Sequence, residues 1–184
     1  MRFPWQSLIS TTLCISFFNV TPLDAGAIEL ADGTTYFLNP PRLLSAFSSQ
    51  DGTYIWGATY YFTLNLPENA GRPLQKIAIV QEGGLGRPLF DADNTRAFEG
   101  TRNRPGTNLP IKQVEFNPDF PALTVEFEQP ILPGTTVTIR LYPVRNPGIA
   151  GTYLYGVTAF PTGERPYGQY LGVGQIRIYD SNLD

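Results

Sequence analysis

Residues 58–67 read ATYYFTLNLP, and this stretch decides the fold. Apolar or aromatic side chains occupy every second position from Ala58 to Leu66, and Thr, Tyr and Asn fill the positions between them. Because alternate residues of an extended chain face the same side, this period of two predicts a β-strand with one buried face and one more polar face. Pro67 cannot donate a ladder hydrogen bond, so it ends the strand.

The same alternation recurs on both sides of this stretch. Shorter runs occur at 77–79, 123–127, 137–141, 153–159 and 176–178, with a first strand expected at 34–38 and a further candidate at 111–116. Turn dipeptides separate them, namely Asn39-Pro40, Asn117-Pro118, Pro133-Gly134 and Asn146-Pro147. Seven or eight strands with such turns predict an all-β fold, an antiparallel β-sandwich with an immunoglobulin-like arrangement; a closed barrel is the alternative.

One short segment has the signals of a helix. Asn94 could cap residues 95–99, and Gly100 would stop them.

Tyr153 supports the sandwich more specifically. It enters the predicted strand 153–160 late in the chain, where many sandwiches place a tyrosine whose hydroxyl bonds back to the backbone at a corner. The alternative is that Tyr153 is simply one of ten tyrosines, located on a strand.

Composition excludes several chemistries. The chain of 184 residues is 42% hydrophobic and 16% charged, and it is rich in Gly (18) and Pro (17), as a turn-rich β protein is. It has no His, one Cys and one Met, so a Ser-His-Asp or Cys-His catalytic system is excluded and a transition-metal site is disfavoured. We expect no cofactor, no metal and no catalytic residue.

Residues 1–27 are typical of a secretory signal peptide. Arg2 gives a positive start, residues 8–18 are largely apolar, and Ala25-Gly26-Ala27 is a small-residue cleavage site. The apolar run is shorter than the roughly 20 residues of a membrane-spanning helix. We therefore expect one β-sandwich domain at 28–184, without a transmembrane span or disulfide, exported to the periplasm, the cell surface or the medium.

Net charge argues against a polyanionic partner. With 13 basic and 16 acidic residues, the chain carries a formal charge of −3, so we expect no nucleic-acid binding.

Three polar clusters have an ordinary interpretation beside a functional one. Glu126 and Glu128 share one face of a predicted strand, as a glycosidase pair could, but a solvated face explains them better. A calcium loop starting at Asp91 and Asp93 fails because Arg96 replaces the required Gly; simple turn formation explains these residues better than a different calcium site with a distant residue such as Asp119. The loop with Arg96, Arg102 and Arg104 could hold an anion, yet nearby acids favour a solvated loop.

The loop between the last two predicted strands is the preferred binding segment. Residues 162–170 read TGERPYGQY and present Arg165, Tyr167 and Tyr170 on a segment shaped by Gly and Pro. Loops on a rigid sandwich often carry binding residues, and Tyr with Arg is favoured at contact surfaces. The alternative is that Tyr170 only opens the last strand and packs there.

Several ordered motifs resemble a known family. They are IELADGTTYFLNPPRL (28–43), WGATYYFTLNLPENAGRPLQKIAI (56–79), PILPGTTVTIRLYPVRNP (130–147), GTYLYGVTAFPTG (151–163) and GQYLGVGQIRIY (168–179). Together they resemble the exported cyanobacterial proteins with domain of unknown function 2808. The resemblance implies an exported single-domain protein and no activity.

Three functions agree with this sequence. The first is a non-enzymatic envelope or extracellular domain that binds a polymer, such as an envelope polysaccharide, or another envelope protein through loops. The second is a small carboxylate-based hydrolase of envelope polysaccharide. The third is a structural surface component that assembles through strand edges.

Overall fold

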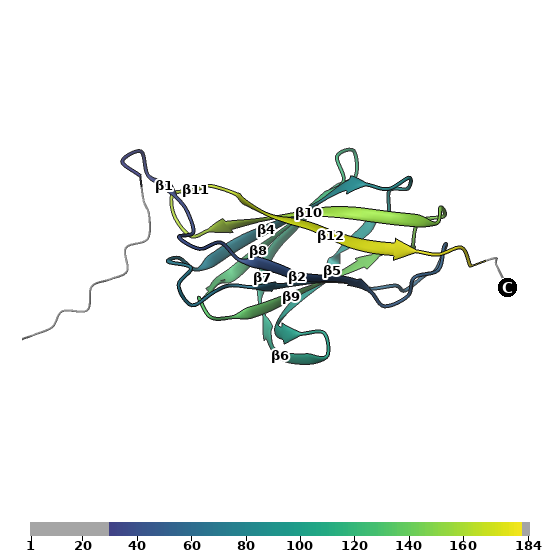
Figure 1. Cartoon of the computed structure of the whole chain (residues 1–184), viewed down its shortest axis with the longest axis horizontal. Coiled ribbons are helices and arrows are strands. Elements are labelled where there is room, and N and C mark those ends of the chain that lie inside the picture. Colours follow the sequence, from purple (N-terminus) through teal and green to yellow (C-terminus); the bar gives the residue numbers. More distant parts are fainter. Residues whose placement is uncertain (1–29, 182–184) are drawn as a thin grey trace, which may run out of the picture.

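The computed structural model describes residues 30–181, and the predicted signal peptide lies outside this range. Two five-stranded antiparallel sheets face each other, with an additional short parallel pair at one end (Figure 1). The strands are β1 (Thr34–Thr35), β2 (Arg42–Ser48), β3 (Tyr60–Asn65), β4 (Leu74–Gly83), β5 (Phe90–Thr101), β6 (Arg104–Leu109), β7 (Ile111–Asn117), β8 (Ala122–Ile131), β9 (Thr136–Pro143), β10 (Gly151–Pro161), β11 (Arg165–Pro166) and β12 (Gln169–Ile178).

The antiparallel β-sandwich is confirmed. One sheet has the order β12-β10-β4-β8-β7, the other has the order β2-β3-β9-β5-β6, and β1 pairs with β11. The predicted number of strands is too low, because the two sheets alone hold ten of the described strands. The strands β2, β5 and β6 of these sheets were not predicted from the sequence, and register shifts hide the first two: β2 shifts between Leu43 and Ser45, and β5 shifts between Asp91 and Arg96, so neither keeps a period of two.

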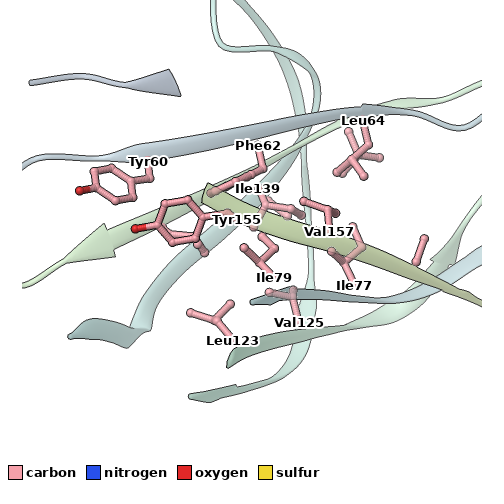
Figure 2. Close-up of a cluster of buried hydrophobic side chains, with 14 of the residues drawn as sticks. Tyr60, Phe62, Leu64, Ile77, Ile79, Leu123, Val125, Ile139, Tyr155 and Val157 are labelled. Carbon is pink, nitrogen blue, oxygen red and sulfur yellow. The ribbon is translucent and has the colours of Figure 1, made fainter. Parts of the chain in front are cut away.

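The decisive stretch forms the centre of its sheet. β3 pairs with β2 on one side and with β9 on the other, and Tyr60, Phe62 and Leu64 are buried as the alternation predicts. Figure 2 shows these three side chains meeting aliphatic residues of the facing sheet, among them Ile79 and Val157. Burial of this apolar surface is the main force that holds the two sheets together.

The predicted helix at 95–99 is wrong, because this segment belongs to β5. Ala97 pairs with Ile139 of β9, and both side chains enter the core. The Asp91 carboxylate accepts a hydrogen bond from the Asn94 backbone N–H over 3.2 Å, so these residues form a bulge rather than a helix cap.

The hairpin of β5 and β6 returns against the outer face of its sheet. Arg102 in the turn lies over the Phe47 ring of β2, with 4.0 Å between the guanidinium carbon and the ring centroid. The Thr138 hydroxyl lies 2.9 Å from that of Thr63 and donates to the Gly100 carbonyl over 2.7 Å. These threonines are buried although they face away from the core, because the hairpin covers them.

Residues 30–181 include no helix long and apolar enough to cross a membrane.

Candidate functional site

Five segments gather at the end where β4, β9 and β12 finish, which lies to the right in Figure 1. They are residues 49–59, 84–89, 118–121, 144–150 and 179–181, and we call them the loop end. Backbone hydrogen bonds join several of them. Tyr54 N–H donates to the Pro147 carbonyl over 3.2 Å, Thr53 N–H donates to the Tyr179 carbonyl over 2.9 Å, and Val144 N–H donates to the Leu89 carbonyl over 2.8 Å. Segments distant in sequence therefore form one surface.

Large apolar and aromatic side chains concentrate on this surface. Half of the sixteen large hydrophobic residues that are exposed among the described ones lie on the loop end. They are Tyr54, Trp56, Leu85, Leu89, Phe120, Val144, Ile149 and Tyr179. Scattered exposed apolar residues are normal, but a cluster of them marks an interaction surface.

An arginine of this surface lies close to two aromatic rings. The Arg145 guanidinium carbon is 5.1 Å from the Tyr54 ring centroid and 5.5 Å from that of Trp56. Both distances suit a cation–π interaction. Tyr54 has φ of 59°, the only positive value of a non-glycine residue at 30–181. A bulky residue adopts this conformation only when its surroundings impose it, and such residues cluster at functional sites.

Gly148 has no side chain, and this leaves room for the Tyr54 ring. A Cβ on Gly148 would overlap the ring and hydroxyl of Tyr54, so the ring lies directly against the backbone there. Glycine at this position therefore allows the aromatic stack to form.

A hollow of about 350 Å³ opens beside the stack. Its walls include Trp56, Leu89, Val144 and Pro147, and its charged residues are Arg87 and Arg145. The volume is at the small end of the range of ligand pockets, which corresponds to one or two side chains rather than a large cofactor.

Asn146 forms part of the hollow and fixes two neighbouring loops. Its side-chain amide donates to the Gln50 carbonyl over 3.0 Å and to the Gly52 carbonyl over 2.9 Å, and its oxygen accepts from the Tyr60 hydroxyl over 3.0 Å. Asn146 is buried, so these bonds compensate for removing its amide from water.

Two further tyrosines lie beneath the loop end. The buried Tyr153 hydroxyl donates to the Ile149 carbonyl over 2.7 Å, which confirms the predicted corner contact.

Tyr155 is also buried, and none of residues 30–181 offers its hydroxyl a hydrogen-bond partner. Burial, reinforced by the neighbouring Tyr60 and Tyr153, raises the pKa of Tyr155 well above its ordinary value. Burial likewise raises the pKa of Tyr60.

The predicted binding residues Arg165, Tyr167 and Tyr170 do not converge on one site. Arg165 donates to the Asp32 carbonyl over 3.1 Å, and the ring centroids of Tyr167 and Tyr36 are 4.9 Å apart. The Tyr170 hydroxyl donates to the Glu82 carboxylate over 2.9 Å, and loss of hydration, reinforced by this bond and by the carboxylate's charge, raises the pKa of Tyr170. Arg165 and Tyr167 thus contact the N-terminal segment, whereas Tyr170 points across the outer face of its sheet toward β4.

The three polar clusters also have specific positions. Glu126 pairs with Lys112 over 2.7 Å, and Glu128 is exposed farther along β8. Asp91 bonds to Asn94, and among residues 30–181 no group of three His, Cys, Asp or Glu side chains could hold a metal ion. Arg96 lies on β5 and donates to the carbonyls of Asp93 and Thr95. Arg102 lies in the turn and Arg104 begins β6, so the three arginines are distributed along the β5–β6 hairpin rather than over one loop.

Reasoning from the sequence missed Tyr54, Trp56 and Arg145. Arg145 is far from both aromatic residues along the chain, so only the fold brings the three together. The available signal was Trp56, an aromatic residue between Gly52 and Gly57 in a segment without strand alternation.

Comparison with solved structures found distant similarities. BslA, described as a bacterial hydrophobin, is 15% identical over 79% of this chain and 100% of its own, with a TM-score of 0.46. The C-terminal domain of the Streptococcus pyogenes antigen I/II-family protein AspA is 15% identical over 73% of this chain, with a TM-score of 0.42, and this chain spans 46% of it. Collagen adhesin (CNA) from S. aureus is 11% identical over 73% of this chain and 48% of its own, with a TM-score of 0.41.

Sequence comparison gave one family and no individual relative. No curated protein matches the chain. The family model of DUF2808, protein of unknown function, matches residues 34–178, and the chain therefore belongs to this family.

Proposed function

We propose that this chain is an exported, non-enzymatic domain that binds a partner protein of the cell envelope through its loop end. The observation that carries the proposal is the gathering of exposed apolar side chains around the Tyr54–Arg145–Trp56 stack. Export is supported by the signal-like residues 1–27.

The chemistry of this surface favours a protein over a polysaccharide. Tyr, Trp and Arg are the residues that most often dominate the energy of protein interfaces. The exposed aliphatic side chains of the loop end, Leu85, Leu89 and Ile149, offer apolar area that a hydroxyl-rich sugar chain would not match. We therefore place the partner's apolar residues against this surface.

The hydrolase alternative has weaker support. Glu126 already pairs with Lys112, and a catalytic carboxylate pair requires two acids facing the same substrate bond. Glu128 lies at an exposed position, with its backbone N–H donating to the Pro110 carbonyl over 3.0 Å. Neither residue lines the hollow at the loop end.

Co-purification from the native envelope tests the proposal. Trp56→Ala should lose the protein that accompanies the tagged wild-type chain, because truncation removes the most exposed aromatic ring of the stack, 66% exposed. Tyr167→Ala is the matched control, since Tyr167 is also a half-exposed aromatic residue but contacts Tyr36 away from the loop end. If Trp56→Ala retains the partner, or if only Tyr167→Ala loses it, the partner binds a surface other than the loop end.

A further inference from the structure

The N–H donors of Arg145 have no acceptor among the other residues at 30–181. Two aromatic rings fix its guanidinium, and no hydrogen bond or ion pair from its side chain to another described residue is present. A guanidinium group has five N–H donors in a planar fork that matches the two oxygens of a carboxylate. The position of Arg145 is therefore prepared for an acceptor that comes from outside.

The charge of the hollow has a single sign. Arg87 and Arg145 both line it, and none of the residues that line it is acidic. Arg87 donates one long hydrogen bond, 3.4 Å, to the Asp119 carbonyl, and no carboxylate at 30–181 forms an ion pair with it. Two exposed cations beside apolar walls make this hollow electrostatically complementary to an anionic ligand.

The walls of the hollow specify the rest of the ligand. Leu89, Val144 and Pro147 line it together with Trp56, so a group next to the anion must be apolar. We infer that the hollow binds an acidic residue of a peptide segment in the partner, with the Asp or Glu carboxylate on Arg145 and an adjacent apolar side chain against these walls. This inference rests on the proposed function, because it assigns the chemistry of the same surface.

A random seven-residue peptide library displayed on phage tests the inference against the full chain. Enriched peptides should carry Asp or Glu next to a large apolar residue. A synthetic peptide from this set should bind Arg145→Gln about tenfold more weakly, because a charge-assisted forked hydrogen bond is lost. Arg177→Gln, which removes the same charge from an exposed position on β12, should bind as the wild type does.

A double-mutant cycle identifies the atoms involved. Replacing the peptide's acidic residue by its amide should weaken binding by a similar factor, and combining this change with Arg145→Gln should add little more. The peptide change does not depend on the folding of any variant. Independent, multiplying effects of the two changes would overturn the pairing of Arg145 with the carboxylate.

The remaining outcomes separate the inference from the proposed function. If the enriched peptides contain no acidic residue, and their binding is lost in Trp56→Ala but kept in Arg145→Gln, the inference is overturned and the proposed function stands. A library without any enriched peptide, or peptides that bind Trp56→Ala equally well, would contradict both. An acidic polysaccharide is the other source of carboxylates, and oligogalacturonate is the probe for it. If no peptide is enriched and oligogalacturonate binds the wild type but not Arg145→Gln, the hollow binds an acidic polysaccharide instead.

Discussion

At the scale of single residues, the tyrosine hydroxyls beneath the loop end differ in what they bond to. Tyr60 donates to Asn146 and Tyr153 donates to the Ile149 carbonyl, whereas the Tyr155 hydroxyl has no partner among residues 30–181. Figure 2 shows the hydroxyls of Tyr60 and Tyr155 on the same side of the core. A buried polar group that lacks a partner loses its hydration without compensation. The same chemical group should therefore have opposite effects on stability at neighbouring positions.

Removing each hydroxyl separately tests this difference. Tyr153→Phe should lower the free energy of unfolding by about 1–3 kcal/mol, because the Ile149 carbonyl loses its buried donor. Tyr155→Phe should leave it unchanged or raise it, because no hydrogen bond is broken. Urea unfolding of both variants measures the two values. Equal losses would mean that the Tyr155 hydroxyl has a partner after all.

Alkaline pH should destabilise the protein through the same tyrosines. Burial raises the pKa of Tyr60 and Tyr155 above the ordinary value of 10, so the unfolded chain releases these protons first. The free energy of unfolding should be constant below about pH 9 and fall above pH 10, by about 1.4 kcal/mol per pH unit for each such group. Urea titrations between pH 7 and 11 measure this fall. Tyr155→Phe should reduce its slope, and an unchanged slope would exclude Tyr155 as a contributor.

At the scale of elements, the hairpin of β5 and β6 depends on Gly100. This residue has φ of +85°, and a Cβ there would overlap the Arg104 carbonyl oxygen. Gly100→Ala should therefore cost more than about 1 kcal/mol of unfolding free energy and speed amide exchange at residues 101–109. Asn103→Ala in the exposed turn of the same hairpin is the control and should change neither measurement. Equal effects of the two substitutions would contradict the role assigned to Gly100.

The elements also show how far the sequence predicts the fold. β3 was predictable because Tyr60, Phe62 and Leu64 alternate without interruption, and Tyr153 was predictable because a corner contact is local, four residues from Ile149. β5 was misread as partly helical because its bulge at 91–96 interrupts the alternation. The aromatic stack was missed because Arg145 meets Tyr54 and Trp56 only after the sheets have formed.

At the scale of the whole molecule, the two ends of the sandwich differ in chemistry. The end with β1 and β11 is closed by contacts within the chain, since Arg165 bonds to the Asp32 carbonyl and Tyr167 meets Tyr36 (Figure 1). The loop end instead leaves Trp56 and Arg145 directed at solvent with a hollow beside them. A rigid sandwich with one such end is suited to holding a partner in a fixed orientation.

The most direct test of the central claim is photo-crosslinking in the native envelope. A photoreactive amino acid at Leu85, which is 82% exposed on the loop end, should give a covalent adduct with one partner protein. The same amino acid at Leu132, 66% exposed in the turn between β8 and β9 at the opposite end, should give none. Adducts from position 132 but not from position 85, or adducts with polysaccharide alone, would contradict the account.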